Sequence, residues 1–280
     1  MIPAAFDYEL AESVEHACSL LGKDPDAKLL AGGHSLLPAM KLRIARPSKL
    51  VDIGRLSDLA YVKDDGTHIA IGALTRHAAV ASDALLAEHC PIVSHTAGQI
   101  GDPQVRHRGT LGGTLSHGDP ASDMPAVMLA LGADLVARGK GGERVVPAAE
   151  FFTGVFETAL APDEVLVEAR VPKLGASTGW AYLKANRRAQ DWATVGVAAL
   201  VHRDNGSVAG ASIGLVNMGA TPLRAKAAED ALAGGSTPAD AAAHVTEGTE
   251  PPSDQAGSSE YRAHLAQVLT RRALEQALGG

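Results

Sequence analysis

Two glycine pairs constrain this chain more than any other feature of its sequence. Gly32-Gly33 follows the short apolar run 28–31, and Gly112-Gly113 lies within the segment 110–114. A glycine pair after a strand lets backbone N–H groups approach an anion with no Cβ in the way, and successive amides in such a turn form a concave phosphate site. A single pair is most often a plain turn, but two pairs flanked by hydroxyl side chains suit a diphosphate. We therefore expect a side chain at Gly33 or Gly112 to push the anion away.

Composition excludes several classes of protein. The 280 residues are 46% hydrophobic and 20% charged, which suits two or three compact units, each with its own core. The formal charge of -7, with no basic block, disfavours a nucleic-acid partner. The sequence has no apolar run long enough to span a membrane, and Asp7 and Glu9 replace the basic region of a secretory signal. A cytoplasmic protein is therefore expected.

The cysteine content argues against a metal centre in this chain. Cys18 and Cys90 are the only cysteines, and neither belongs to a Cys-x-x-Cys pair. An iron–sulfur cluster or a cysteine zinc site usually needs four thiolates, so any such centre must lie in another chain. We interpret both cysteines as small buried hydrophobic residues in helical stretches.

Short helices and strands alternate along the first part of the chain, which predicts α+β layers. Apolar spacing predicts helices near 11–21, 36–44, 84–100 with an interruption at Pro91, and 124–131. Strands are expected near 28–31, 50–53, 61–62, 69–71, 133–138, 143–146 and 165–171. The second glycine segment is expected to be a loop like the first.

A domain boundary is expected after the strand that ends at Pro172, because residues 173–179 are rich in Gly, Ser and Thr. We place the two domains at 1–175 and 176–280. The second domain is expected to contain strands near 180–186, 194–202 and 207–216 and helices near 223–233, 237–246 and 259–278.

The common nucleotide and hydrolase motifs are missing from the sequence. Neither glycine pair fits Gly-x-Gly-x-x-Gly between a strand and a long helix, and no Gly-x-x-x-x-Gly-Lys-Ser/Thr occurs. The sequence also lacks Gly-x-Ser-x-Gly and His-Glu-x-x-His. A Rossmann dehydrogenase, a P-loop kinase and a hydrolase are therefore disfavoured.

Three segments stand out: AGGHSLLPAMKLR at 31–43, QVRHRGTLGGTLSHGDPASD at 104–123 and YLKANRRAQDWATVG at 182–196. They closely resemble the FAD-binding medium subunit of molybdenum hydroxylases, the group of xanthine dehydrogenase and carbon monoxide dehydrogenase. The similarity in pattern covers essentially the whole chain, and His34 with Asp191-Trp192 most resembles the carbon monoxide dehydrogenase branch. The resemblance implies a flavoprotein fold of the PCMH or vanillyl-alcohol-oxidase type. That fold has two α/β subdomains around FAD and a small C-terminal α+β domain.

The resemblance also implies the residues that bind FAD. Segments 31–35 and 110–114 should wrap the diphosphate, and Asp123 should accept a hydrogen bond from a ribityl or ribose hydroxyl. An alternative for Asp123 is the N-cap of the helix at Met124. The implied cofactor-binding residues are Ala31, Gly32, Gly33, His34, Ser35, Ile100, Thr110, Leu111, Gly112, Gly113, Thr114, Asp123, Leu166, Lys184 and Trp192.

Four of these residues should lie near the rings of FAD. Ile100 and Leu166 match apolar positions against the flavin or adenine, with ordinary core as the alternative. Lys184 matches a lysine at the polar edge of the flavin, with a solvated strand lysine as the alternative. Trp192 matches an aromatic position beside the isoalloxazine, with a core tryptophan of the C-terminal domain as the alternative.

The implied function is that of an oxidoreductase subunit which passes electrons from iron–sulfur clusters through FAD to an acceptor linked to NAD or quinone. The implied partners are a large molybdenum subunit and a small 2Fe-2S subunit, in a heterotrimer that dimerises. No catalytic side chain is expected, because flavin electron transfer needs no side-chain nucleophile, and His34 and His117 are interpreted as polar groups near phosphate. Two alternatives remain: a stand-alone PCMH-type flavin oxidoreductase and a non-catalytic nucleotide-binding module.

Overall fold

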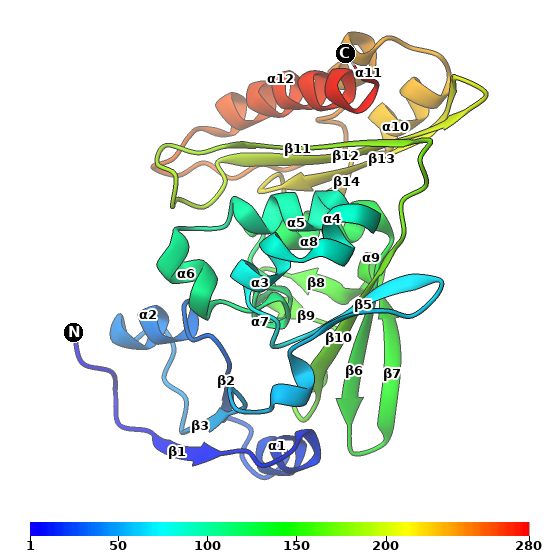
Figure 1. Cartoon of the computed structure of the whole chain (residues 1–280). Coiled ribbons are helices and arrows are strands. Elements are labelled where there is room, and N and C mark those ends of the chain that lie inside the picture. The colour runs from blue at the N-terminus through cyan, green and yellow to red at the C-terminus, as the bar shows by residue number, and fades with distance from the viewer. Residues whose placement is uncertain (280) are drawn as a thin grey trace.

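The computed structural model describes residues 1–279 and arranges them in layers of sheet and helix (Figure 1). The smallest sheet is parallel and has the strand order β1-β3-β2, from β1 (Asp7–Leu10), β2 (Lys28–Leu30) and β3 (Lys49–Asp52). Two helices accompany it, α1 (Val14–Leu21) and α2 (Leu36–Lys41). The expected strands near 28–31 and 50–53 and the first helix are confirmed.

Helix α1 begins where its sequence provides a cap. The Ser13 side chain accepts a hydrogen bond from the His16 N–H, and one face of the helix is buried against Val51 and Ile53. Sequence reasoning missed β1, because its four residues DYEL show no apolar alternation and are half-buried or exposed. The strand forms through pairing with β3, a contact between distant segments of the chain.

The second sheet is antiparallel and has the order β4-β5-β10-β6-β7. Its strands are β4 (Val62–Asp64), β5 (His68–Gly72), β6 (Asp134–Gly139), β7 (Gly142–Pro147) and β10 (Val165–Pro172). The helices on and around it are α3 (His77–Ser82), α4 (Ala84–His89), α5 (Pro91–Gly98), α6 (Pro103–Arg108), α7 (Leu111–His117), α8 (Asp123–Leu131) and α9 (Ala148–Phe151). The 3-10 turn Ser57–Leu59 and the small hairpin of β8 (Phe152–Gly154) and β9 (Glu157–Thr158) complete this part.

The third sheet is antiparallel, with the order β11-β12-β13-β14. Its strands are β11 (Thr178–Ala185), β12 (Val195–Asp204), β13 (Ser207–Val216) and β14 (Leu223–Arg224), followed by α10 (Lys226–Ala233), α11 (Pro238–Ala243) and α12 (Ser259–Ala277). The expected helix at 223 starts later, because Leu223 and Arg224 pair with β13.

Helices cover both faces of this third sheet (Figure 1). Helices α10 and α12 pack on one face, and α5 and α8 pack on the other, between it and the second sheet. Every residue of α8 is buried as a result. Strand β13 approaches α8 so closely that a Cβ on Gly214 would lie 2.2 Å from the Ala126 carbonyl oxygen. The described helices include none with the length and apolar character that a bilayer crossing requires.

Candidate functional site

A cavity of about 960 Å³ collects the residues that the sequence singles out. Cavities of this size hold small-molecule ligands and cofactors. All the predicted cofactor-binding residues line it except Leu111: Ala31, Gly32, Gly33, His34, Ser35, Ile100, Thr110, Gly112, Gly113, Thr114, Asp123, Leu166, Lys184 and Trp192. Leu111 is fully buried in the core of the middle layers, so it does not reach the cavity. The helix turns its side chain inward, and a role of Leu111 in binding the cofactor stays a prediction.

The first glycine segment forms an open turn between β2 and α2. Gly33 has a φ of +77°, in the left-handed region that favours glycine. A Cβ on Gly32 would lie 2.4 Å from the carbonyl oxygen of Arg108, so the two glycine-bearing parts of the chain meet here backbone to backbone. Within residues 1–279, the N–H groups of residues 32–35 donate to no acceptor. They are therefore available to an anion in the cavity.

The second glycine segment is a helix start, so the expected loop at 110–114 is wrong. Thr110 caps α7, and its Oγ1 accepts a hydrogen bond from the Gly113 N–H at 3.1 Å. The Gly112 N–H donates to the Ala73 carbonyl oxygen at 2.8 Å, and a Cβ on Gly112 would lie 2.4 Å from the Ala73 Cβ. Glycine is required at position 112 because the helix packs against residue 73. A side chain at position 112 would therefore disrupt this packing before it affected an anion in the cavity.

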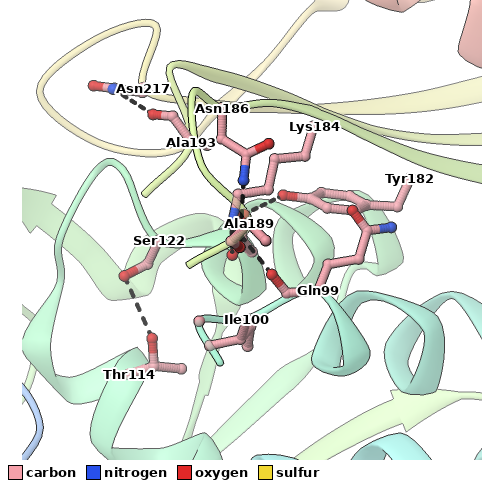
Figure 2. Close-up of polar contacts among 12 residues, drawn as sticks. Gln99, Ile100, Thr114, Ser122, Tyr182, Lys184, Asn186, Ala189, Ala193 and Asn217 are labelled. Atoms are coloured by element: carbon pink, nitrogen blue, oxygen red, sulfur yellow. Dashed lines mark hydrogen bonds and ion pairs between the residues drawn. The ribbon is translucent and has the colours of Figure 1, made fainter. Parts of the chain in front are cut away.

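Asp123 joins α8 to β11 through a buried polar cluster. Its side chain is paired with Lys184, whose Nζ lies 2.9 Å from Oδ2, and Tyr182 donates its hydroxyl to Oδ1. Figure 2 shows the Tyr182 and Lys184 side chains projecting from the same strand toward one region beside Gln99. Ser122 occupies the N-cap position of α8, so the alternative role of Asp123 as the cap is wrong.

Burial and charge act against each other in this cluster. Burial raises the pKa of the Asp123 carboxyl, while the Lys184 ammonium and the Tyr182 hydroxyl oppose that rise. Burial, then the Asp123 charge, raises the pKa of Tyr182 well above its ordinary value. The side chains of Asp123 and Lys184 are only 4% and 3% exposed, so each depends on the other for compensation. Each still has unused hydrogen-bonding capacity toward the cavity.

Two apolar side chains provide part of the cavity wall. Leu166 on β10 is 3% exposed and belongs to the core of the middle layers. Ile100 is half-buried, packs against the same core and lies beside Gln99 in Figure 2. Both residues belong to the core and also line the cavity, because the core extends to the cavity edge, and their contact with the flavin or adenine stays a prediction.

Trp192 lies on the segment between β11 and β12 and is 53% exposed. The alternative of a core tryptophan is therefore wrong. A hydrogen bond holds the C-terminal end of this segment, just before β12 begins: the Asn217 side chain donates to the Ala193 carbonyl oxygen at 2.8 Å (Figure 2). Buried Arg262 donates to the carbonyl oxygen of Thr194. An exposed indole at the cavity edge provides a flat face for a ring system.

The histidines differ in exposure and surroundings. His34 is exposed, whereas His117 stacks on Phe156 with ring centroids 4.9 Å apart, and burial lowers its pKa. Sequence reasoning missed other cavity residues, among them His77, Phe156 and Gln190. No local pattern marks them, because they reach the cavity only through the packing of α3, the β8–β9 hairpin and the 186–194 segment.

The residues of the cavity fit a flavin dinucleotide. Open backbone N–H groups suit a diphosphate, an aspartate suits a sugar hydroxyl, and apolar walls with an exposed indole suit flat rings. In the part of the chain described, residues 1–279, no three His, Cys, Asp or Glu side chains gather as a metal site would require.

Comparison with known families agrees with this fit. The family described as "FAD binding domain in molybdopterin dehydrogenase" matches residues 4–174. The family described as "CO dehydrogenase flavoprotein C-terminal domain" matches residues 180–277.

Individual proteins are similar along their whole length. The carbon monoxide dehydrogenase medium chain of Afipia carboxidovorans is 43% identical, over 99% of this chain and 98% of its own. The 6-hydroxypseudooxynicotine dehydrogenase complex subunit alpha of Paenarthrobacter nicotinovorans is 41% identical, over 99% and 96%. A structure of carbon monoxide dehydrogenase from Hydrogenophaga pseudoflava, lacking the Mo-pyranopterin moiety, superposes with a TM-score of 0.96 at 44% identity, over 99% of this chain and 98% of that one.

Proposed function

The chain belongs to the family of FAD-binding subunits of molybdenum hydroxylases, and from this premise we propose that it links iron–sulfur clusters of a partner chain to an external electron acceptor. When bound, FAD supplies the electron chemistry, and the chain supplies binding, orientation and electrostatics. One observation carries the proposal: a single cavity joins the open N–H groups of 32–35, the Asp123–Lys184 pair and exposed Trp192.

The diphosphate of FAD is assigned to the first glycine segment. The free N–H groups of residues 32–35 donate to it. Thr114 of α7 lines the same cavity, and its hydroxyl donates to the Ser122 hydroxyl at 3.4 Å, so Thr114 orders the wall beside the diphosphate (Figure 2). Thr110, Gly112 and Gly113 contribute by shape, since their polar groups are engaged in capping and packing. Asp123 uses its remaining lone pairs for a hydroxyl of the ribityl or ribose group.

The flavin rings are assigned to the other part of the cavity. The Lys184 ammonium has three N–H donors, of which one meets Asp123 at 2.9 Å and another the Gln99 carbonyl oxygen at 3.4 Å. The remaining donor is directed to the polar edge of the ring system. Ile100 and Leu166 contact the rings from the apolar wall, and Trp192 covers one face.

The metal centres and the substrate chemistry are assigned to partner chains. Burial raises the pKa of Cys90 to about 12 and also raises the pKa of Cys18, so both thiols stay protonated and are poor ligands. We assign the clusters to a small 2Fe-2S subunit and the substrate site to a large molybdenum subunit, in a heterotrimer that dimerises. The acceptor is one linked to NAD or quinone.

Carbon monoxide is the substrate we favour for the complete complex. The medium chain of a carbon monoxide dehydrogenase is 43% identical to this chain, and another such enzyme gives a TM-score of 0.96. A nicotine-derived substrate is the second candidate, because the alpha subunit of the 6-hydroxypseudooxynicotine dehydrogenase complex is 41% identical to this chain.

The two domains are proposed to divide at residue 175. Strand β10 ends at Pro172, and the two family matches stop at 174 and begin again at 180. The domains nevertheless share a core, since Tyr182, Leu200 and Val216 of the C-terminal sheet cluster with side chains of α8. We therefore expect them to unfold together.

Bound FAD is expected to be non-covalent, because the cavity presents no cysteine and its N–H donors need only hydrogen bonds to hold a diphosphate. Denaturing the purified chain in acid should release intact FAD into the supernatant, where chromatography identifies it. Flavin that stays with the precipitated protein, or a supernatant that contains only FMN, would contradict the assignment of the glycine segment to a diphosphate.

The isolated chain is expected to be a competent flavoprotein but not a substrate oxidase. Dithionite should bleach its flavin spectrum, whereas carbon monoxide or the nicotine-derived substrate should not. Adding the molybdenum and iron–sulfur chains should make bleaching depend on substrate. If substrate rapidly reduces the lone, metal-free chain, the subunit proposal fails and a stand-alone flavin oxidoreductase takes its place.

A further inference from the structure

His77 is a buried histidine whose ring nitrogens have no hydrogen-bond partner among the described residues. It is 3% exposed at the start of α3 and lines the cavity. Its Nδ1 is enclosed by protein and has no hydrogen-bond partner within residues 1–279. Its Nε2 also makes no hydrogen bond to those residues but is not enclosed, so Nε2 is the ring nitrogen that a ligand in the cavity can reach. Polar atoms of a buried side chain are normally paired, so an accessible and unpaired Nε2 at a cavity wall suits a bound ligand. The ring therefore has free hydrogen-bonding capacity at the cavity wall.

Gly109 is what allows the imidazole to lie at this wall. A Cβ at position 109 would lie 2.8 Å from the His77 Cδ2 and 3.3 Å from Nε2. The backbone joins the same two residues, because the His77 N–H donates to the Gly109 carbonyl oxygen at 3.0 Å. The ring edge that carries Nε2 thus occupies space that any residue other than glycine would fill.

The same glycine also touches the first glycine segment. A Cβ on Gly32 would lie 2.9 Å from the Cα of Gly109. Gly32, Gly109 and His77 therefore form a continuous strip of the cavity wall, beside the N–H groups of 32–35 that have no acceptor. The strip offers one side-chain N–H next to a row of backbone N–H groups.

We propose that His77 donates a hydrogen bond from its imidazole to the diphosphate of bound FAD, as the side-chain member of the anion site. This inference rests on the proposed function and adds a binding residue to it. A diphosphate fits the strip because its oxygen atoms only accept hydrogen bonds, and the strip presents unpaired N–H groups together with an imidazole that is able to donate.

The charge state of the ring is consistent with a neutral donor. Burial, followed by the positive charge of Arg106, lowers the pKa of His77 to about 4. The imidazole is therefore neutral near pH 7 and carries one N–H. We do not assign Arg106 to the diphosphate, because its guanidinium donates to the Ile100 and Gly101 carbonyl oxygens at 3.0 and 3.1 Å.

The test uses the full-length chain after reversible removal of FAD, titrated separately with FAD, ADP and riboflavin. His77→Phe should lower the affinities for FAD and for ADP by the same factor, about tenfold or more, because each ligand loses one hydrogen bond to its charged diphosphate. Riboflavin has no phosphate, so its affinity should not change. His77→Gln keeps a side-chain N–H and should recover part of the loss. His95→Phe, at an exposed position outside the cavity, should bind all three as the parent does.

A second measurement needs no variant to fold. In the parent chain labelled with 15N-histidine, saturating ADP should shift the ring resonances of His77 but not those of His95. Three outcomes would each overturn the inference: unchanged His77 resonances, a His77→Phe protein that binds FAD as tightly as the parent, or a loss of riboflavin affinity equal to the loss of FAD affinity. None of them would contradict the proposal that the chain binds FAD. A parent chain that binds no FAD would overturn the proposed function, and this inference with it.

Discussion

Replacing Gly32 with alanine is expected to lower the affinity for FAD by at least about a hundredfold, since losing two charge-assisted hydrogen bonds costs about 3 kcal/mol. The added Cβ would lie 2.4 Å from the Arg108 carbonyl oxygen, which is backbone and has little room to yield. The two parts of the chain must then separate, and the N–H groups of 32–35 move away from the diphosphate. Flavin-to-protein absorbance ratios and fluorescence titration of the FAD-free chain measure the effect.

Gly141→Ala is the matched control for this substitution. Gly141 lies in the β6–β7 turn, has no heavy atom within 4 Å of an added Cβ and does not have a positive φ. It should keep full flavin content. A Gly32→Ala protein that folds and binds FAD like the parent would exclude the first glycine segment as the diphosphate site.

Breaking the Asp123–Lys184 pair is expected to destabilise the chain by about 3–5 kcal/mol for either single substitution, because each leaves an uncompensated buried charge. Both side chains are almost fully buried, and they join α8 to β11 across the proposed domain boundary. Lys184→Met and Asp123→Asn are suitable variants, since the asparagine still accepts a hydrogen bond from Tyr182. Urea unfolding of the FAD-free chain measures the free energy of unfolding.

The double variant decides whether the loss comes from the pair. Asp123→Asn with Lys184→Met removes both charges, so it should be clearly more stable than the sum of the single effects predicts. Arg271→Met is the control, because Arg271 and Glu275 are about half exposed on α12 and such pairs contribute little. If the two single effects simply add, Asp123 and Lys184 are not coupled and the buried pair is not what joins these elements.

Local sequence signals predicted several helices and turns of the chain. The helix at α1 followed from apolar spacing closed by Gly22, and its N-cap proved to be Ser13. The strands expected near 194–202 and 207–216 leave Asp204-Asn205-Gly206 between them, and this turn joins β12 and β13 with φ values of 50° at Asn205 and 83° at Gly206. Such signals work because capping and turn geometry depend on residues a few positions apart.

The same local reasoning failed where packing decides the conformation. A glycine pair reads as a loop, but Thr110 caps a helix there and Ala73 receives the N–H of Gly112. The left-handed turn at Gly33 agrees with the local expectation, whereas Gly112 is needed for a contact 39 positions away in the chain. Two identical dipeptides therefore have different physical roles.

The sequence by itself determined many of the helices and strands and the family to which the chain belongs, and fourteen of the fifteen residues that it predicted for the cofactor line the cavity, because these follow from short-range pattern and from motifs. Tertiary structure alone decided what those residues do. It paired Asp123 with Lys184, 61 positions apart, turned Leu111 into the core and exposed Trp192. It also brought His77 beside Gly109. Burial, pairing and unmet hydrogen bonds are properties of contacts between distant segments, and no local window of sequence contains them.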